Sequence, residues 1–279
     1  MNLQSFNPLK FPRSTQITLL LWVLTMISLP IVGWIWGEES LIRGMSVGVV
    51  MQAIAVLTVL RNAWGLSRTL RTLAIVAALS YFAEWLGSKT GFPFGAYHYT
   101  DALQPQLAGV PLLIPLAWMM MLAPAWAIAK IILPKHDNPK LPFSIIHSLL
   151  SAFAFTAWDL FLDPQMVGWG FWVWATPGIY FGIPFSNYLG WLLVSFLLTL
   201  AAHPRDLPLG PLAVIYALTW FLQTIGQGIF WGQPGPAAFG FLGMGIFILL
   251  AFSNFQVESL HKKQEIYHHG NDGTRRKSI

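Results

Sequence analysis

The sequence contains no cysteine and few charged residues. The absence of cysteine excludes disulfide bonds, thiol catalysis and metal sites built from thiolates. Charged residues make up 10% of the 279 positions and hydrophobic residues 55%, whereas a soluble domain carries about 25% charged residues. A chain this poor in charge cannot cover itself with polar surface, so lipid is its expected solvent.

Long apolar runs predict membrane-spanning helices, because a helix needs about 20 apolar residues to cross the hydrocarbon core. The expected spans are eight, at about 17–36, 41–60, 69–88, 108–129, 143–163, 184–202, 210–230 and 235–254. Irregular backbone is not tolerated against lipid, so the fold class is an all-α, polytopic integral membrane bundle. We expect one transmembrane domain, residues 1–257, and a basic, disordered cytoplasmic tail, residues 258–279.

The positions of the basic residues support this count. With the amino terminus in the cytoplasm, all of the 16 lysines and arginines except Arg43 and Lys89 fall in inner segments. The positive-inside rule predicts this asymmetry. Both termini are therefore expected in the cytoplasm, and the positive charge gives no reason to expect a nucleic acid as partner.

Three carboxyl groups lie inside or at the margin of predicted spans, near the outer membrane face. Glu84 is near the outer end of the third span, and Asp159 and Asp163 are near the outer end of the fifth, in "AWDLFLDP". The aspartates are spaced i, i+4 and share a helix face. Two carboxyl groups in a partly dry site cannot both ionise easily, so the pair is expected to hold a proton for general-acid catalysis. The alternative is a helix terminus in water at Asp163–Pro164, but acids inside a membrane are costly and usually functional.

Two aromatic loops frame these carboxyl groups. The first is "EWLGSKTGFPFGAYHYT", residues 84–100, and the second, residues 164–188, has no charged residue and is expected to fold back as a re-entrant lid. Aromatic ring faces stabilise a hydrocarbon cation, although an ordinary interfacial belt is an alternative for the tryptophans. The predicted substrate-binding residues are Phe92, Phe94, Tyr97, His98, Tyr99, Trp158, Trp169, Trp172, Trp174 and Asn187. Asn187 could orient a water or cap its helix, and His98 could relay a proton or only form a hydrogen bond.

These stretches, with "WDLFLDPQMV" and "GIYFGIPFSNYLGW", resemble the membrane carotenoid 1′,2′-hydratases of the γ-carotene 1′-hydroxylase and bisanhydrobacterioruberin hydratase type. The resemblance covers about residues 80–230. It implies a hydro-lyase without cofactor or metal that adds water across the terminal C1′–C2′ double bond of a lycopene- or γ-carotene-type end group. It also implies a multi-pass protein of a bacterial plasma or thylakoid membrane, with a carotenoid substrate, surrounding lipid, and a downstream carotenoid glycosyltransferase or desaturase as candidate partners.

The residues fit a mechanism for such a reaction. A carboxyl group of the Asp159–Asp163 pair would protonate C2′, and the aromatic loops would hold the tertiary cation at C1′. A water activated by the other carboxylate or by Glu84 would then add to C1′.

Two other functions remain open from the residues. The "DLFLD" spacing resembles half of the aspartate-rich magnesium motif of membrane prenyltransferases, but only one such element is present, and Arg43 and Lys89 alone could meet phosphate on the outer face. A non-catalytic lipid or pigment carrier would use the aromatic cavity and would not need the carboxyl groups.

Overall fold

The computed structural model describes residues 3–133 and 143–275, and within them the side chains of residues 5–133 and 144–254. Eight helices in this part of the chain are long and apolar enough to cross a membrane, which confirms the predicted bundle. They are α1 (Arg13–Trp36), α2 (Glu38–Trp64), α3 (Leu66–Thr90), α4 (Ile114–Ile132), α5 (Phe143–Gly168), α6 (Phe185–Ala202), α7 (Leu209–Ile225) with the π-helical turn η3 (Gly226–Phe230), and α8 (Pro234–Arg275). The short 3-10 helices η1 (Leu3–Phe6) and η2 (Pro8–Lys10) precede α1.

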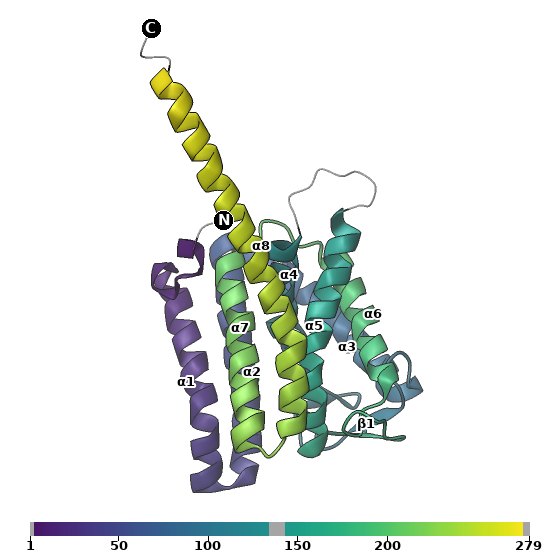
Figure 1. The fold of residues 1–279 in the computed structure, drawn as a ribbon. Helices are drawn as coiled ribbons and strands as arrows, with labels where there is room; N and C mark the ends of the chain where they lie inside the picture. Colours follow the sequence, from purple (N-terminus) through teal and green to yellow (C-terminus); the bar gives the residue numbers. More distant parts are fainter. Residues whose placement is uncertain (1–2, 134–142, 276–279) are drawn as a thin grey trace.

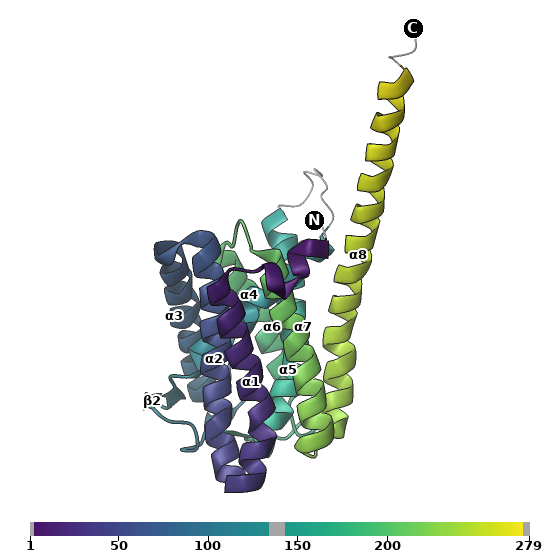
Figure 2. The ribbon, with the colours of Figure 1, turned by 90° about the vertical axis from the view of Figure 1, so that its left-hand side faces the viewer.

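Helix α4 forms the centre of the bundle. It contacts α2, α3, α5, α7 and α8, and every residue from Trp118 to Ala129 is buried. A helix that is apolar on all sides is expected in a core, and the stretch "WMMMLAPAWAIA" has this character. Helix α1, by contrast, lies at the edge of the bundle (Figures 1 and 2) and leaves many apolar side chains exposed. Its outer side is therefore suited to contact with lipid.

The start of α1 and the far end of α8 lie at one end of the bundle, and strand β1 (Tyr97–Tyr99) lies at the other (Figure 1). This arrangement is what an even number of spans requires. Arg43 at the start of α2 and Lys89 at the end of α3 therefore belong to the β1 end. The placement of the other end in the cytoplasm remains a prediction.

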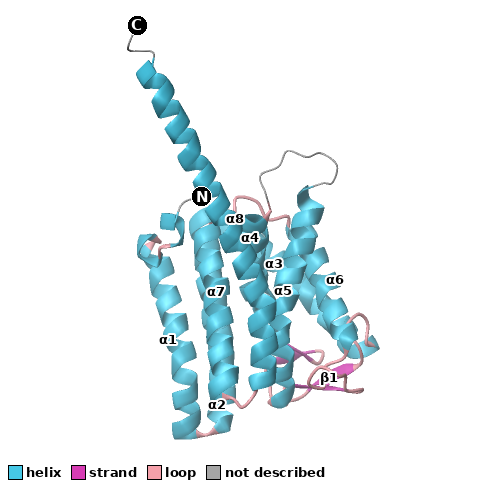
Figure 3. Ribbon diagram, viewed as in Figure 1, coloured by secondary structure: helices cyan, strands magenta, loops and turns pink. Residues whose placement is uncertain are grey.

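Two long connections meet in a small antiparallel sheet at the β1 end (Figure 3). Strand β1 follows α3, and it pairs with β4 (Trp172–Trp174), which follows α5. In this register Tyr97 faces Trp174 and Tyr99 faces Trp172. A second hairpin, β2 (Gln106–Leu107) with β3 (Val110–Pro111), precedes α4, so α4 begins at Ile114 rather than at the predicted 108. The second loop thus pairs with the first instead of acting alone as a lid.

Helix α5 continues past Pro164 to Gly168, whereas the sequence predicts an end near residue 163. Proline has no backbone N–H, so Pro164 cannot donate to the carbonyl of Leu160. The hydroxyl of Tyr180, from the following loop, donates to that carbonyl at 2.9 Å. Asp163 is therefore inside the helix and buried, which rules out the helix terminus in water.

Helix α8 continues through Arg275, so its backbone is helical beyond residue 258, where the sequence predicts a disordered tail. The stretch "LHKKQEIY" contains no proline or glycine, and lysine, glutamine and glutamate have good helix propensity. Residues 276–279 lie outside the described part of the chain. The division into a membrane domain and a separate tail remains a prediction.

Candidate active site

Glu84 is buried at the β1 end of α3, where its carboxylate accepts three hydrogen bonds. The hydroxyls of Tyr97 and Tyr99 donate to Oε2 at 2.6 and 2.8 Å. The indole N–H of Trp118 donates to Oε1 at 2.9 Å. An ionised carboxylate can only accept hydrogen bonds, so this set of donors is suited to holding Glu84 as a buried anion.

Strand alternation brings both tyrosines to Glu84, because residues i and i+2 of a strand point to the same side. His98, between them, is exposed on the other side. Burial raises the pKa of Tyr97 and Tyr99 well above the usual tyrosine value, and the neighbouring Glu84 charge raises both further. The two hydroxyls therefore remain neutral donors over the physiological pH range.

Asp159 and Asp163 lie one turn apart on α5 and are 0% and 1% exposed. The side-chain nitrogen of Asn187 donates to Oδ2 of Asp159 at 2.8 Å and also to Oδ2 of Asp163. Trp172 donates its indole N–H to Oδ1 of Asp163 at 3.1 Å. Oδ1 of Asp159 has no hydrogen-bond partner among the described residues. Because two carboxyl groups converge on one amide, one shared proton would avoid two adjacent buried charges.

Asn187 serves the aspartates and does not cap its helix. It is the third residue of α6, whose N-cap position is Pro184 without a side-chain hydrogen bond. An amide side chain has two N–H groups, and here one is directed to each aspartate. Of the two roles that the sequence allows, capping is therefore wrong.

Phe94 fixes the first loop between α3 and α6. A Cβ atom at Gly87 would lie 2.7 Å from the Phe94 ring, and one at Gly190 would lie 2.6 Å from it. Both distances are too short for close-packed carbon atoms, so glycine at these positions lets the ring enter between the helices. The hydroxyl of Ser186 also donates to the Phe94 carbonyl at 2.9 Å. This anchoring places β1, and with it Tyr97, beside Glu84.

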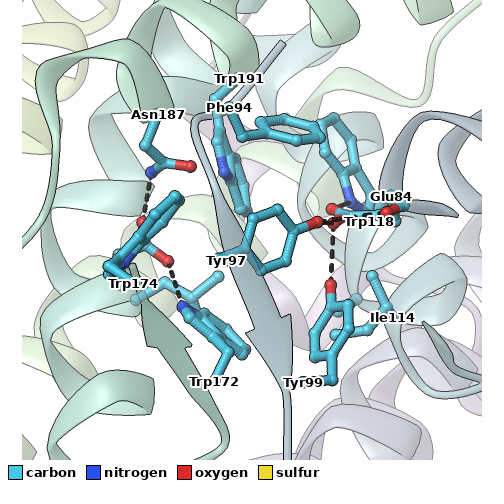
Figure 4. Close-up of a pocket in the computed structure, with 13 residues that line it drawn as sticks. Glu84, Phe94, Tyr97, Tyr99, Ile114, Trp118, Trp172, Trp174, Asn187 and Trp191 are labelled. Atoms are coloured by element: carbon cyan, nitrogen blue, oxygen red, sulfur yellow. Dashed lines mark hydrogen bonds between the residues drawn. The ribbon is translucent and has the colours of Figure 1, made fainter. Parts of the chain in front are cut away.

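A cavity of about 30 Å³ lies between the two acidic groups; we name it the carboxyl cavity. Glu84 and Asp163 both line it, whereas Asp159 does not. Figure 4 shows Glu84 on one side of the Tyr97 ring and Asn187 on the other. A water molecule needs about 10–15 Å³ of such volume. The cavity therefore has room for one or two waters in reach of both acidic groups.

Aromatic rings form most of the wall of the carboxyl cavity. Trp118 and Trp191 stack with ring centroids 4.8 Å apart, and Tyr97 lies 5.1 Å from Trp174. The lining residues are Glu84, Phe94, Tyr97, Tyr99, Ile114, Ala117, Trp118, Leu162, Asp163, Trp172, Trp174, Asn187 and Trp191. Ring faces attract a cation without bonding to it, so this wall would stabilise a carbocation and leave it free to react with water.

The structure separates the sequence-predicted residues into two groups. Those that line the carboxyl cavity are Glu84, Asp163, Phe94, Tyr97, Tyr99, Trp172, Trp174 and Asn187, with Asp159 behind Asp163. Phe92, 63% exposed, and His98 point away from it. Trp169 packs against Trp231 at 5.4 Å, and Trp158 lines a neighbouring cavity. Phe92, His98, Trp158 and Trp169 therefore do not line the carboxyl cavity, because only one side of each segment can face it, and their role in binding substrate stays a prediction.

Sequence reasoning missed Trp118 and Trp191, as well as Ile114, Ala117 and Leu162. A signal for Trp118 was present, since a tryptophan deep in an apolar span needs an acceptor for its N–H. Trp191 lies four residues after Asn187 and therefore on the same helix face. The three aliphatic residues have no such signal in the sequence.

The partners of the aspartates are N–H donors. Within the described residues, no group of three or more His, Asp or Glu is arranged to hold a metal ion. Magnesium binds oxygen ligands, whereas both aspartates here face the amide nitrogen of Asn187. This geometry gives no support to the prenyltransferase alternative.

Comparisons with known proteins agree with these features. The model of a family described as "Carotenoid biosynthesis protein" matches residues 44–205, which include all three acidic residues and Asn187. Over 125 residues the chain is 37% identical to bisanhydrobacterioruberin hydratase of Haloarcula japonica; this covers 43% of the chain and 41% of the length of that relative. No solved structure matches the chain significantly. Because the family model spans more than half of its residues, the chain belongs to the carotenoid biosynthesis protein family.

Proposed function

We propose that the protein hydrates the terminal C1′–C2′ double bond of an acyclic carotenoid end group. The observation that carries this proposal is the carboxyl cavity, a water-sized space with Glu84 and Asp163 both in its aromatic wall. Family membership supports a carotenoid substrate. The relative from Haloarcula japonica is named a hydratase, which supports addition of water as the reaction.

Asp163 is the proton donor in this proposal, because it lines the carboxyl cavity and Asp159 does not. Asp159 acts through Asp163, since the two carboxyl groups meet at Asn187 and share one proton. Asp159 is thus a positioning residue, and Asn187 holds the pair in register. Trp172 orients the other oxygen of Asp163.

Glu84 is the base that accepts a proton from water. Three neutral donors stabilise its ionised form, and it lines the same cavity as Asp163. A water in this space lies within reach of a carboxylate that removes its proton. Because Tyr97 and Tyr99 do not ionise readily, they add no competing negative charge.

The reaction balances with these groups alone. Asp163 transfers a proton to C2′, which leaves a tertiary cation at C1′ beside the rings of the cavity wall. Water forms the C1′–O bond, and its surplus proton passes to Glu84. That proton returns from Glu84 to the aspartate pair through water in the carboxyl cavity. The sum is alkene plus water giving a tertiary alcohol.

The test is pigment analysis in lycopene- and γ-carotene-producing cells that express the protein. We expect a more polar carotenoid that is heavier by one molecule of water. Asp163→Asn and Glu84→Gln should abolish it, and Asp159→Asn should reduce it strongly. Asp101→Asn, an exposed acid in the loop after β1, is the matched control and should retain it.

Three outcomes separate the alternatives. A well-expressed wild type that leaves both pigments unchanged contradicts hydration of these substrates. A pigment that co-purifies unchanged, with no effect of any acidic substitution, supports a carrier. If the hydrated product appears and all three variants still form it, the function stands and the assigned residues are wrong.

A further inference from the structure

A second cavity, of about 60 Å³, adjoins the carboxyl cavity. Ile114, Ala117, Leu162 and Trp172 line both spaces and form the wall between them. The second cavity extends from Leu103 and Phe171, in the loops of the β1 end, to Gln52 in α2. It is thus a pocket directly next to the acidic groups that also reaches into the interior of the bundle.

Four methionines from four helices line this second cavity: Met26 of α1, Met45 of α2, Met120 of α4 and Met166 of α5. We name it the methionine chamber. No acidic, basic or histidine side chain is among its described lining residues. The amide nitrogen of Gln52 is already engaged, donating to Thr219 at 3.0 Å and to the sulfur of Met121 at 3.2 Å. Methionine side chains are flexible and adapt to irregular apolar shapes, so the chamber can widen around a ligand.

Water and alkene need separate places before they react. The carboxyl cavity has room for water but not for a branched end group as well. Most of the chamber's lining is apolar, so an uncharged alkene would lose little by leaving lipid for it; its polar lining residues are Ser46, Gln52 and Gln223, and Oε1 of Gln223 has no hydrogen-bond partner among the described residues. The two spaces therefore differ in size and polarity as the two reactants do.

We infer that the methionine chamber binds the branched, uncharged alkene end of the substrate, while the carboxyl cavity holds the reacting water. This inference rests on the proposed function for the identity of the ligand. In it, the shared wall is where the reactants meet, so C1′ and C2′ lie against Ala117 and Leu162, with Asp163 beyond them.

Thiol labelling tests this assignment, because the chain has no cysteine of its own. Val49 lines the methionine chamber, and Val47, on the same helix, is 53% exposed on the bundle surface. Val49→Cys and Val47→Cys proteins, purified from cells without carotenoids, are labelled with an apolar maleimide with and without lycopene. At ten times its Kd, lycopene leaves about one-tenth of the sites free. Labelling of Val49→Cys should slow about tenfold, and that of Val47→Cys should not change.

Equal labelling of Val49→Cys with and without lycopene overturns the inference. So does equal protection by a saturated phosphatidylcholine, which would identify the chamber as a site for lipid acyl chains. If the Val49→Cys thiol does not react even without ligand, lycopene bound per protein is compared between Val49→Phe and Val47→Phe. The first should bind about tenfold more weakly, because the larger side chain would fill part of the methionine chamber, and equal binding by both contradicts the inference.

Labelling reports binding and not turnover, so the two proposals fail separately. Protection of Val49→Cys by lycopene that is never hydrated would leave the chamber as a carotenoid site and remove the hydratase proposal. Hydration of lycopene without protection would leave the hydratase proposal and remove the chamber.

Discussion

Replacing Asn187 with leucine removes one amide that serves both aspartates while keeping the side chain close in size. The side-chain nitrogen donates to Asp159 and to Asp163 in a site where both are almost fully buried. In the variant, neither carboxyl group has a substitute donor from α6. Both carboxyl groups are buried, and only Asp163 lines the carboxyl cavity, so bulk water cannot replace the lost bonds as it does on a surface, and the cost of unpaired acceptors should appear in the free energy of unfolding.

The size of the effect follows from the charge state of the pair. A neutral hydrogen bond contributes about 0.5–1.5 kcal/mol, and one to a charged group about 1.5–3 kcal/mol. With one aspartate protonated and the other ionised, Asn187→Leu should lower the free energy of unfolding by roughly 2–4.5 kcal/mol. At about 2–4 °C per kcal/mol for a large domain, Tm should fall on the order of 5–15 °C.

The assay is thermal unfolding of the purified protein in detergent, with Asn62→Leu as control. The side-chain nitrogen of Asn62 also makes two hydrogen bonds, to Ser14 and Thr15, but the residue is exposed. The double variant Asp159→Leu with Asn187→Leu should recover part of the loss, because removing both partners of a buried hydrogen bond costs less than removing one. A loss for Asn187→Leu no larger than for Asn62→Leu would refute the reasoning.

Three further predictions concern the same end of the bundle. Glu84→Gln should abolish hydration while Tm changes by only a few degrees, because the amide oxygen can still accept from Trp118 and the amide N–H groups can donate to the hydroxyl oxygens of Tyr97 and Tyr99; a Tm loss as large as that of Asn187→Leu would contradict this. Tyr97 and Tyr99 have raised pKa values, so the tyrosinate absorbance of the folded protein at pH 11 should be the same for wild type and the Tyr97→Phe/Tyr99→Phe variant. After unfolding, when all 7 tyrosines of the wild type ionise, the wild type should absorb more; a difference already in the folded state would count against buried neutral tyrosines. Gly190→Ala should lower stability by about 1–3 kcal/mol, measured by thermal unfolding, because its Cβ would lie 2.9 Å from the Pro93 backbone, whereas Gly228→Ala, with 3.6 Å to its nearest neighbour, should change little.

Helix positions were predictable from the sequence because each helix that crosses the membrane needs a long, predominantly apolar run of residues. The observed helix ends differ from the predicted ones where a single tertiary contact outweighs the apolar pattern. Pro164 marks a helix end in sequence, yet Tyr180 supplies the missing donor to the carbonyl of Leu160 and α5 continues. This contact joins residues 20 positions apart, so the spacing of apolar residues along the sequence cannot predict it.

The carboxyl groups of the candidate site were predictable, and so were five of the seven aromatic residues of its wall, whereas Trp118 and Trp191 were not. Acidic residues in apolar spans stand out individually, so Glu84, Asp159 and Asp163 could be found without a structure. An aromatic loop gives no such distinction between Tyr97, which faces the bundle, and His98, which faces out. That choice depends on the pairing of β1 with β4, a contact between segments more than 70 residues apart.

Because β1 and β4 come from different loops, the site has a consequence for biosynthesis. A nascent chain that has emerged only as far as α5 already carries all three acidic side chains and the donors of Glu84, yet it lacks the donor from α6. Until α6 follows, its aspartates therefore lack the amide that both of them share in the folded protein. Ribosome-bound chains arrested before and after residue 187 should then differ in protease resistance, with the longer chain protected at the junction of the two loops.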